Sequence, residues 1–260
     1  MFAMCMECFK KLGRPSFEPF WVPYYNDRIG YMECSQGHKS ALLLQSQKFE
    51  VLLESGANAL AAGFTLEAAS TFSAALERFY EFCLQVISDH GKMGTDTYKE
   101  MFDSMARQSE RQLGAFMALH AAELGTAYRP NEKITEFRNK VIHKGQIPTP
   151  EEAHEFCGKV YAEIFRVHET LAQNFKSAVQ NVVSLDLKMR SEQIPKGMPA
   201  STTTGTTFFN LAYAQNKATF KEAFDEYIKA RERLIGAGPS LRALHLGLLP
   251  VVPQSDMPTG

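Results

Sequence analysis

The sequence predicts an all-α fold: an up-and-down bundle of about five helices, with a small β module at its N-terminus and a helical extension at its C-terminus. Two observations predict it. Between residues 46 and 180, apolar side chains recur at three- and four-residue steps, the period of amphipathic helices. Before residue 46 the composition changes to proline, aromatic residues and cysteine, which is typical of strands and turns.

The overall composition limits the kinds of function to consider. The chain has 260 residues, 45% of them hydrophobic, which suffices for one substantial core and a small accessory module. Its 28 basic and 29 acidic residues almost cancel, so any site for a polyanion must be local. Five cysteines, an odd number, argue against a closed disulfide framework. Because no apolar run approaches the roughly 18–20 residues of a membrane span, and no signal-peptide pattern is present, we expect a cytoplasmic protein without membrane contact.

Residues 1–45 hold two pairs of metal-ligating side chains. Cys5 and Cys8 form the first pair, and Cys34 and His38 form the second, next to Gly37. Two short-spaced pairs joined by a longer loop suit a tetrahedral zinc ion, because each pair can sit on one tight turn. Four protein ligands fill the coordination shell, so we predict a structural rather than a catalytic zinc ion. The competing interpretation is a set of free cysteines in a short reduced segment.

Capping residues and helix stops divide the remainder of the chain. The expected helices run from 46 to 63, 65 to 90, 95 to 124, 131 to 144 and 150 to 179. A polar stretch inside the third, residues 107–112, marks a bend or a contact surface. The bundle therefore covers residues 46–183. We expect a linker at 184–207, a helix at 208–235 that docks back on the bundle or on a partner, and a flexible tail at 236–260.

The fourth expected helix has two distinct faces. With about 100° per residue, Ile134, Phe137 and Val141 share the face toward the core. The second face carries a cation, an amide, an apolar residue and an imidazole, which are Arg138, Asn139, Ile142 and His143. A solvated face has no use for Ile142, so we predict that this face packs against a second copy of the protein.

These side chains could act on a phosphodiester. Arginine presents a fork of donors to phosphate oxygens, and histidine can take or give a proton near neutral pH. RNA supplies its own nucleophile, the 2′-hydroxyl, so one base and one cation would suffice without a metal. Glu77, which can pair with Arg138 or with its neighbour Arg78, and Lys140 are candidates for supporting roles. An arginine and a histidine near a helix end are also common on ordinary solvated surfaces, so spacing alone leaves both interpretations open.

The pattern Arg138-Asn139-x3-His143 on the penultimate long helix of a small bundle resembles the HEPN superfamily. In that family a polar residue follows the arginine, and the histidine comes about four to six residues after it. The resemblance covers roughly residues 46–180. It implies a helical bundle that dimerises through this face and, in active members, a metal-independent endoribonuclease. Arg138 and His143 would then be catalytic, and Asn139 would orient or assist.

Several members of that superfamily lack activity and only bind nucleotides or partners, and those often lack the arginine or the histidine. Both residues are present here, and the N-terminal module resembles a zinc ribbon. We therefore expect a homodimeric, RNA-cleaving toxin or defence factor with a structural zinc ion and, as a toxin, a neutralising protein partner. The alternative is a non-catalytic module that binds RNA, a nucleotide or a protein.

Overall fold

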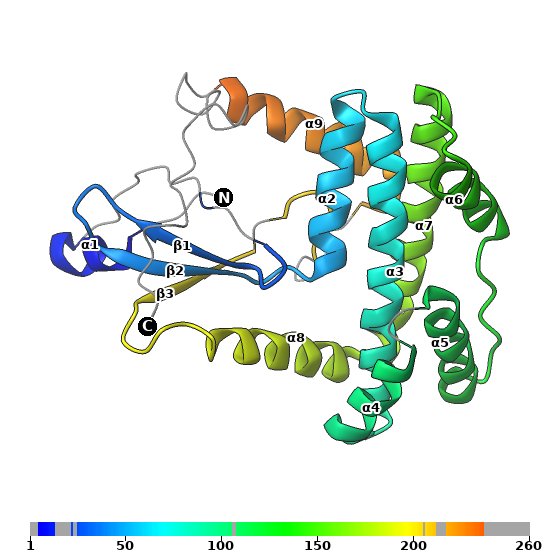
Figure 1. The fold of residues 1–260 in the computed structure, drawn as a ribbon, viewed down its shortest axis with the longest axis horizontal. Helices are drawn as coiled ribbons and strands as arrows, with labels where there is room; N and C mark the ends of the chain where they lie inside the picture. Colours follow the sequence, from blue (N-terminus) through cyan, green and yellow to red (C-terminus); the bar gives the residue numbers. More distant parts are fainter. Residues whose placement is uncertain are drawn as a thin grey trace.

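The computed structural model describes residues 5–13, 22, 25–105, 108–204, 206–211 and 217–236. Within them the chain forms a bundle of helices beside one three-stranded sheet (Figure 1). The expected flexible tail, 236–260, lies outside the described residues except for Gly236. None of the helices in the described ranges combines the length and hydrophobicity that a membrane-spanning segment needs.

The bounds of the elements are as follows. The helices are α1 Met6–Leu12, α2 Lys48–Ala61, α3 Thr65–His90, α4 Thr95–Met105, α5 Ser109–Leu124, α6 Glu132–Lys144, α7 Pro150–Asn174, α8 Lys176–Ser191 and α9 Phe220–Gly236. The strands are β1 Ile29–Glu33, β2 Lys39–Leu44 and β3 Ala200–Thr203.

Helix α3 is the centre of the bundle. It contacts α2, α5, α6, α7 and α8, which surround it (Figure 1). Its own apolar side chains are buried along its whole length, from Ala68 and Phe72 near its start to Val86 and Ile87 near its end. The sequence prediction of a helical bundle is confirmed, because the three- and four-residue spacing of these side chains produces a helix that neighbours can cover on several sides.

Helices α2 and α3 pack unusually closely at Gly56. A Cβ atom built on Gly56 would lie 2.5 Å from Cδ2 of the Phe72 ring, which is fully buried. Glycine is therefore needed here because the two helices approach closely. Its backbone conformation does not require it, because Gly56 is not among the residues with positive φ.

Two expected helices are each divided in the structure. The third ends at Met105 as α4, and α5 begins at Ser109 after the extended N-cap residue Gln108, so the helix is interrupted at the start of the polar stretch. The fifth was expected to run without interruption to about 179, which is wrong: α7 ends at Asn174 and α8 begins at Lys176. Between them Phe175 leaves helical geometry and buries its ring against His90 of α3, with ring centroids 4.8 Å apart. The apolar period continues on both sides of the break, so the sequence pattern did not reveal it.

The expected linker at 184–207 is also wrong in part, because α8 continues to Ser191 and β3 follows. Strand β3 pairs in parallel with β2, in the register Ala41↔Ala200 to Leu44↔Thr203. Strand β2 pairs on its other edge with β1 in an antiparallel hairpin, from Ile29↔Leu43 to Glu33↔Lys39. Because β2 is apolar and buried, it needs hydrogen-bonding partners on both edges. The N-terminal sheet is thus completed by chain that follows the bundle.

The C-terminal helix starts later than the expected residue 208. Phe208 and Phe209 are buried in a non-helical segment, and α9 begins at Phe220 and packs on α7, which confirms docking on the bundle. Carboxylates of α2 hold this segment: Glu54 accepts the backbone N–H groups of Thr207 and Phe208, at 2.5 and 3.1 Å. Glu50 accepts that of Leu211 at 2.7 Å. Burial raises the pKa of Glu50 to about 7, although backbone N–H donors oppose the shift.

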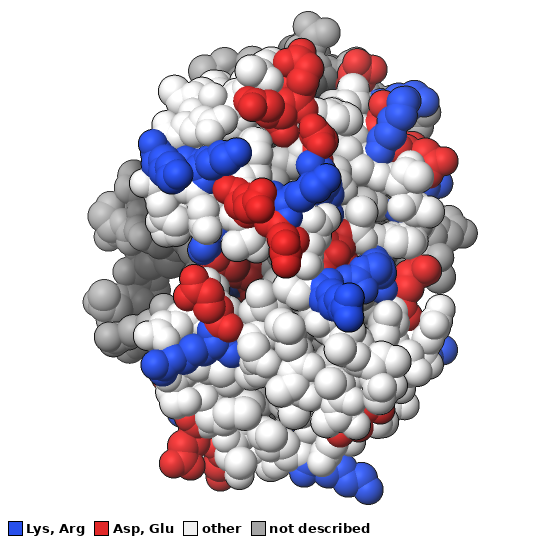
Figure 2. All heavy atoms as spheres, turned by 90° about the vertical axis from the view of Figure 1, so that its right-hand side faces the viewer, with Lys and Arg blue, Asp and Glu red and all other residues white. Residues whose placement is uncertain are grey.

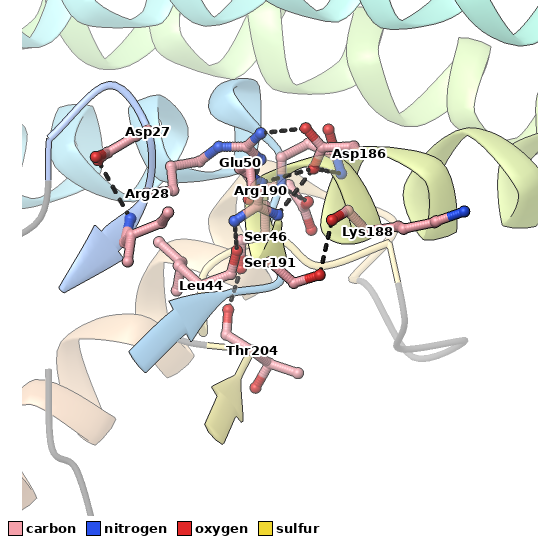
Figure 3. A network of polar contacts seen from close by, with 12 residues as sticks. Asp27, Arg28, Leu44, Ser46, Glu50, Asp186, Lys188, Arg190, Ser191 and Thr204 are labelled. Atoms are coloured by element: carbon pink, nitrogen blue, oxygen red, sulfur yellow. Dashed lines mark hydrogen bonds and ion pairs between the residues drawn. The ribbon is translucent and has the colours of Figure 1, made fainter. Parts of the chain in front are cut away.

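A buried ionic network joins the sheet to the bundle (Figure 3). Arg28, just before β1, contacts Asp186 of α8 at 2.6 Å and donates to the Ser46 carbonyl at 2.7 Å. Arg190 contacts the same carboxylate at 2.8 Å and donates to the Leu44 carbonyl at 2.9 Å. Both arginines are 5% exposed. Since an uncompensated buried charge is costly, this network holds the base of the hairpin against α8.

The close approach at Gly56 leads to a stability prediction. We expect Gly56→Ala to lower the free energy of unfolding by about 1–3 kcal/mol, because the new methyl group must displace the Phe72 ring. The matched control is Gly114→Ala in α5, where nothing lies within 4 Å of the added atom. That change should stabilise by about 0.5–1 kcal/mol through helix propensity alone. Urea unfolding of both variants measures the difference, and equal effects would contradict the packing argument.

Candidate metal centre and polar face of helix α6

The first pair of metal-ligating residues lies at a helix start, not on the turn of a strand-and-turn segment as the sequence predicted. Cys5 is the N-cap of α1, and its sulfur accepts the backbone N–H of Cys8 at 3.5 Å. Gly13 ends the helix in the left-handed conformation. This contact between the N-cap and the third helical residue holds both cysteines at the first turn of α1.

The second pair lies at the tip of the β1–β2 hairpin. The backbone N–H of Cys34 donates to the His38 carbonyl at 3.0 Å, and that of Gly37 donates to the Cys34 carbonyl at 2.8 Å. Gly37 has a φ of 73°, which a residue with a side chain rarely adopts. The sequence prediction that Gly37 supplies this turn is confirmed.

The two pairs meet in one cluster. The ligand atoms of Cys5, Cys8, Cys34 and His38 all lie within 4.8 Å of one another. The three sulfurs are each 3.3–3.7 Å from Nδ1 of His38, and the sulfurs of Cys8 and Cys34 are 3.8 Å apart. The other ring nitrogen, Nε2, faces Lys11 at 2.8 Å, outside the cluster. The three cysteines are buried, so the four residues could hold a metal ion in a site shielded from solvent.

The surroundings of Cys34 favour its thiolate form. Burial alone would raise the pKa of Cys34, but backbone hydrogen bonds from His38 and Gln36, with contacts to the other two sulfurs, outweigh burial and lower it. Thiolate is the form of cysteine that binds metal ions. The donor set and its hydrogen bonding therefore agree with a metal site.

Helix α6 carries the second group of candidate residues. The side chain of Asn131 caps its start by accepting the backbone N–H of Lys133 at 3.1 Å, and Gly145 ends it with a φ of 67°. Ile134 and Val141 are buried, and Phe137 stacks on Phe156 of α7 with ring centroids 4.7 Å apart. The predicted core face and helix stop are confirmed. The remaining side of the helix is available for polar side chains.

On that side, Arg138 is paired with Glu77 of α3. Its Nη2 lies 2.5 Å from the Glu77 carboxylate, and its Nη1 lies 3.5 Å from the amide oxygen of Asn139. The structure thus brings Glu77 to Arg138, one of the two pairings that the sequence left open. Asn139, which the resemblance assigns an orienting or assisting role, directs its amide oxygen toward Arg138. About a quarter of the Arg138 and Glu77 side chains is exposed, 24% and 27%, so solvent and ligands can reach both.

The end of α6 is open to solvent. His143 lies in the last turn and is exposed, and its ring makes no hydrogen bond or ion pair with any residue that the structure describes. Ile142 is 44% exposed, and Ile147, just beyond the helix, is 73% exposed. An exposed imidazole, with no polar partner in the described part of the chain, and two exposed isoleucines therefore share this end of the helix.

Lys140 lies apart from Arg138. It lines a cavity of 270 Å³ between α6 and α7, together with two further lysines, three glutamates and the stacked phenylalanine pair, which are Lys133, Lys159, Glu136, Glu152, Glu155, Phe137 and Phe156. Arg138 instead faces α3. The structure therefore places Lys140 away from Arg138, and their positions give no support to the supporting role predicted for Lys140.

The sequence interpretation missed how far the ion pairs extend along α3. Arg78 lies 3.8 Å from the second oxygen of Glu77 and 2.6 Å from Glu81. Burial raises the pKa of Glu81, while Arg78 acts against that shift. The spacing of Arg78 and Glu81, three residues apart on a helix, is a signal that could have identified the pair.

The surface over α5, α6 and α7 shows basic and acidic side chains interleaved, without a broad basic field (Figure 2). A polyanion would therefore be bound locally, as the near-neutral charge of the chain predicts. No known protein family, curated protein or solved structure matches this chain.

The cluster geometry leads to a metal-content prediction. Protein prepared without chelator should contain about one metal ion per chain, and Cys8→Ser should lose most of it, because a structural site needs all four ligands. The variant should also unfold at lower temperature, since metal binding is coupled to folding. Elemental analysis and a thermal melt measure both effects. Cys157→Ser, at a buried cysteine of α7 outside the cluster, is the control and should keep its metal. Equal metal content in both variants would contradict the assignment.

Proposed function

We propose that this protein is a metal-independent endoribonuclease, in which Arg138 binds the scissile phosphate and His143 transfers protons. One observation carries the proposal: a guanidinium that is about a quarter exposed and an exposed imidazole, without a polar partner among the described residues, project from the same helix within its last two turns. Arginine suits the two oxygens of a phosphodiester, and histidine suits proton transfer near neutral pH. The resemblance of the motif to HEPN ribonucleases agrees with this assignment.

The reaction needs no group from outside RNA and protein. The 2′-oxygen attacks the adjacent phosphorus, and the bond from phosphorus to the 5′-oxygen breaks. An imidazole takes the proton of the 2′-hydroxyl, and a second acid gives a proton to the departing 5′-oxygen. Arg138 stabilises the negative charge that develops on the phosphate oxygens. The products are a 2′,3′-cyclic phosphate and a 5′-hydroxyl end.

A homodimer would supply the second acid. Two copies packed through the end of α6 place two His143 side chains beside one groove, one as base and the other as acid. Ile142 and Ile147 offer an apolar contact for such packing, and large exposed apolar groups are typical of interaction surfaces. The catalytic site is therefore proposed to form between two copies.

The metal ion is proposed to be zinc, with Cys5, Cys8, Cys34 and His38 as its ligands. In a tetrahedral zinc site with bonds of about 2.0–2.3 Å, neighbouring ligand atoms lie about 3.6–3.8 Å apart. Four of the six separations between ligand atoms are 3.3–3.8 Å, and all six lie within 4.8 Å. Zinc supplies a cross-link between α1 and the hairpin tip, which lets a small module fold.

A second candidate function is a non-catalytic module that binds RNA, a nucleotide or a protein. It is favoured by the Glu77 carboxylate, which lies 2.5 Å from Arg138, because a guanidinium paired with a carboxylate stabilises the negative charge of a transition state less well. Cleavage products distinguish the two candidates.

The test of cleavage uses a labelled single-stranded RNA in buffer freed of Mg²⁺ by resin, without a chelator that would strip the metal cluster. We expect the wild-type protein to leave cyclic-phosphate ends. His143→Ala should lower the rate by about 10²–10⁴-fold through loss of proton transfer. Arg138→Gln should lower it by about 10²–10³-fold through loss of charge stabilisation.

The controls address contaminating nucleases and protein folding. Lys144→Ala, in the same turn of α6, should cleave like the wild type, and RNA carrying 2′-O-methyl groups should stay intact. Intact RNA with folded wild-type protein at high concentration would refute the enzyme and leave the binding module.

The dimer is tested separately. Ile142→Glu should convert a dimer into a monomer in light scattering, because it places a carboxylate in an apolar contact. Met189→Glu is the matched control: Met189 is 56% exposed on α8, which lies across the molecule from α6 (Figure 1). A monomeric wild type, or an unchanged mass for Ile142→Glu, would exclude this interface.

A further inference from the structure

Four charged side chains alternate in sign between α6 and α3. They are, in spatial order, Arg138, Glu77, Arg78 and Glu81, with successive separations of 2.5, 3.8 and 2.6 Å. Each side chain is between 19% and 33% exposed. The row is therefore neutral as a whole and half-buried.

In this arrangement Arg138 is already paired with a carboxylate, because its Nη2 donates to Oε1 of Glu77. A phosphodiester that binds Arg138 with two parallel hydrogen bonds competes with this carboxylate for the donors and the charge of the guanidinium. A half-buried carboxylate without a partner, next to a bound anion, would cost part of the binding energy.

Arg78 can receive the displaced carboxylate. Its Nη1 is held by Glu81 at 2.6 Å, whereas its Nη2 points to the other oxygen of Glu77 at 3.8 Å, beyond a hydrogen bond. A guanidinium has five donors in a fork and can serve two carboxylates at once. Because Glu77 and Arg78 are neighbours on α3, rotation of side chains closes the gap and the backbone stays in place.

We propose that Glu77 is an exchangeable partner of Arg138, which moves to Arg78 when a phosphodiester of RNA binds. Arg78 is then a positioning residue: it lowers the cost of opening the phosphate site and does not touch the RNA. This inference rests on the proposed function for the location of the phosphate at Arg138. It adds the reason why a site that is self-neutralised when empty can still take up an anion.

The experiment measures affinity without cleavage. The probe is a fluorescent, 2′-O-methylated single-stranded RNA, titrated at one fixed salt concentration and followed by anisotropy. The proteins are the wild type, Glu77→Gln, Arg78→Gln, the double variant and Arg138→Gln. Glu77→Gln should bind roughly five- to tenfold more tightly, because no charged competitor remains. Arg78→Gln should bind more weakly by a similar factor.

The double variant carries the decisive comparison. If Arg78 acts by receiving Glu77, then Arg78→Gln should have no effect once Glu77 is Gln. If Arg78 contacts RNA directly or contributes only positive charge, Arg78→Gln should weaken binding equally in the wild type and in the Glu77→Gln variant. That outcome refutes the exchange. Weaker binding by Glu77→Gln would also refute it, because Glu77 would then support Arg138 in the bound state.

Arg138→Gln separates this inference from the proposed function. Suppose that the wild type binds RNA, Arg138→Gln does not, and the effects of Glu77→Gln and Arg78→Gln are additive. That result overturns only the exchange. If the wild type and Arg138→Gln bind RNA equally, or neither binds, both the RNA site and the exchange are overturned. Asp225→Asn, which breaks an exposed ion pair of 2.6 Å on α9, should change nothing. A thermal melt of every variant checks that it is folded. If Arg78→Gln is unstable, Arg78→Met replaces it.

Discussion

The burial of α3 is the constraint on which the rest of the structure depends. Five helices pack around it, so apolar or small side chains occupy most of its circumference. Among its polar side chains, Glu77, Arg78 and Glu81 form a charged row that reaches Arg138 of α6. The same helix therefore provides the core of the bundle and the charged row at the candidate site. A change in the packing of α3, such as a larger residue at Gly56 against Phe72, would therefore be expected to disturb both.

The N-terminal sheet is held at both ends of its hairpin by different physical means. Sulfur and imidazole ligands gather at the tip, and two buried arginines share Asp186 at the base. The first group could hold a metal ion. The second needs its three charges to remain together, since loss of any partner leaves a buried ion unpaired. The parallel pairing of β3 with β2 adds backbone hydrogen bonds from a distant segment. The sheet and the bundle consequently stabilise each other.

Much of the fold could be predicted from local patterns. The period of apolar residues identified the bundle helices, and capping residues such as Asn131 and Thr149, with Gly145 as a stop, marked the boundaries around α6. The paired spacing of Cys5, Cys8, Cys34 and His38 predicted that they meet. The breaks at Phe175 and before Phe220, and the strand at 200–203, were not predictable, because each depends on a contact with a residue far away in the sequence.

The sequence by itself determined which side chains share the polar face of α6, because helical geometry places Arg138, Asn139, Ile142 and His143 on one side whatever surrounds them. Only the tertiary structure decided what that face meets. Packing of α6 on α3 brings Glu77 to Arg138 and leaves His143 exposed. Packing of α6 on α7 places Lys140 at the wall of a separate cavity. The physical reason is that the helical period is a property of the local backbone, whereas ion pairs between helices depend on how the whole core closes.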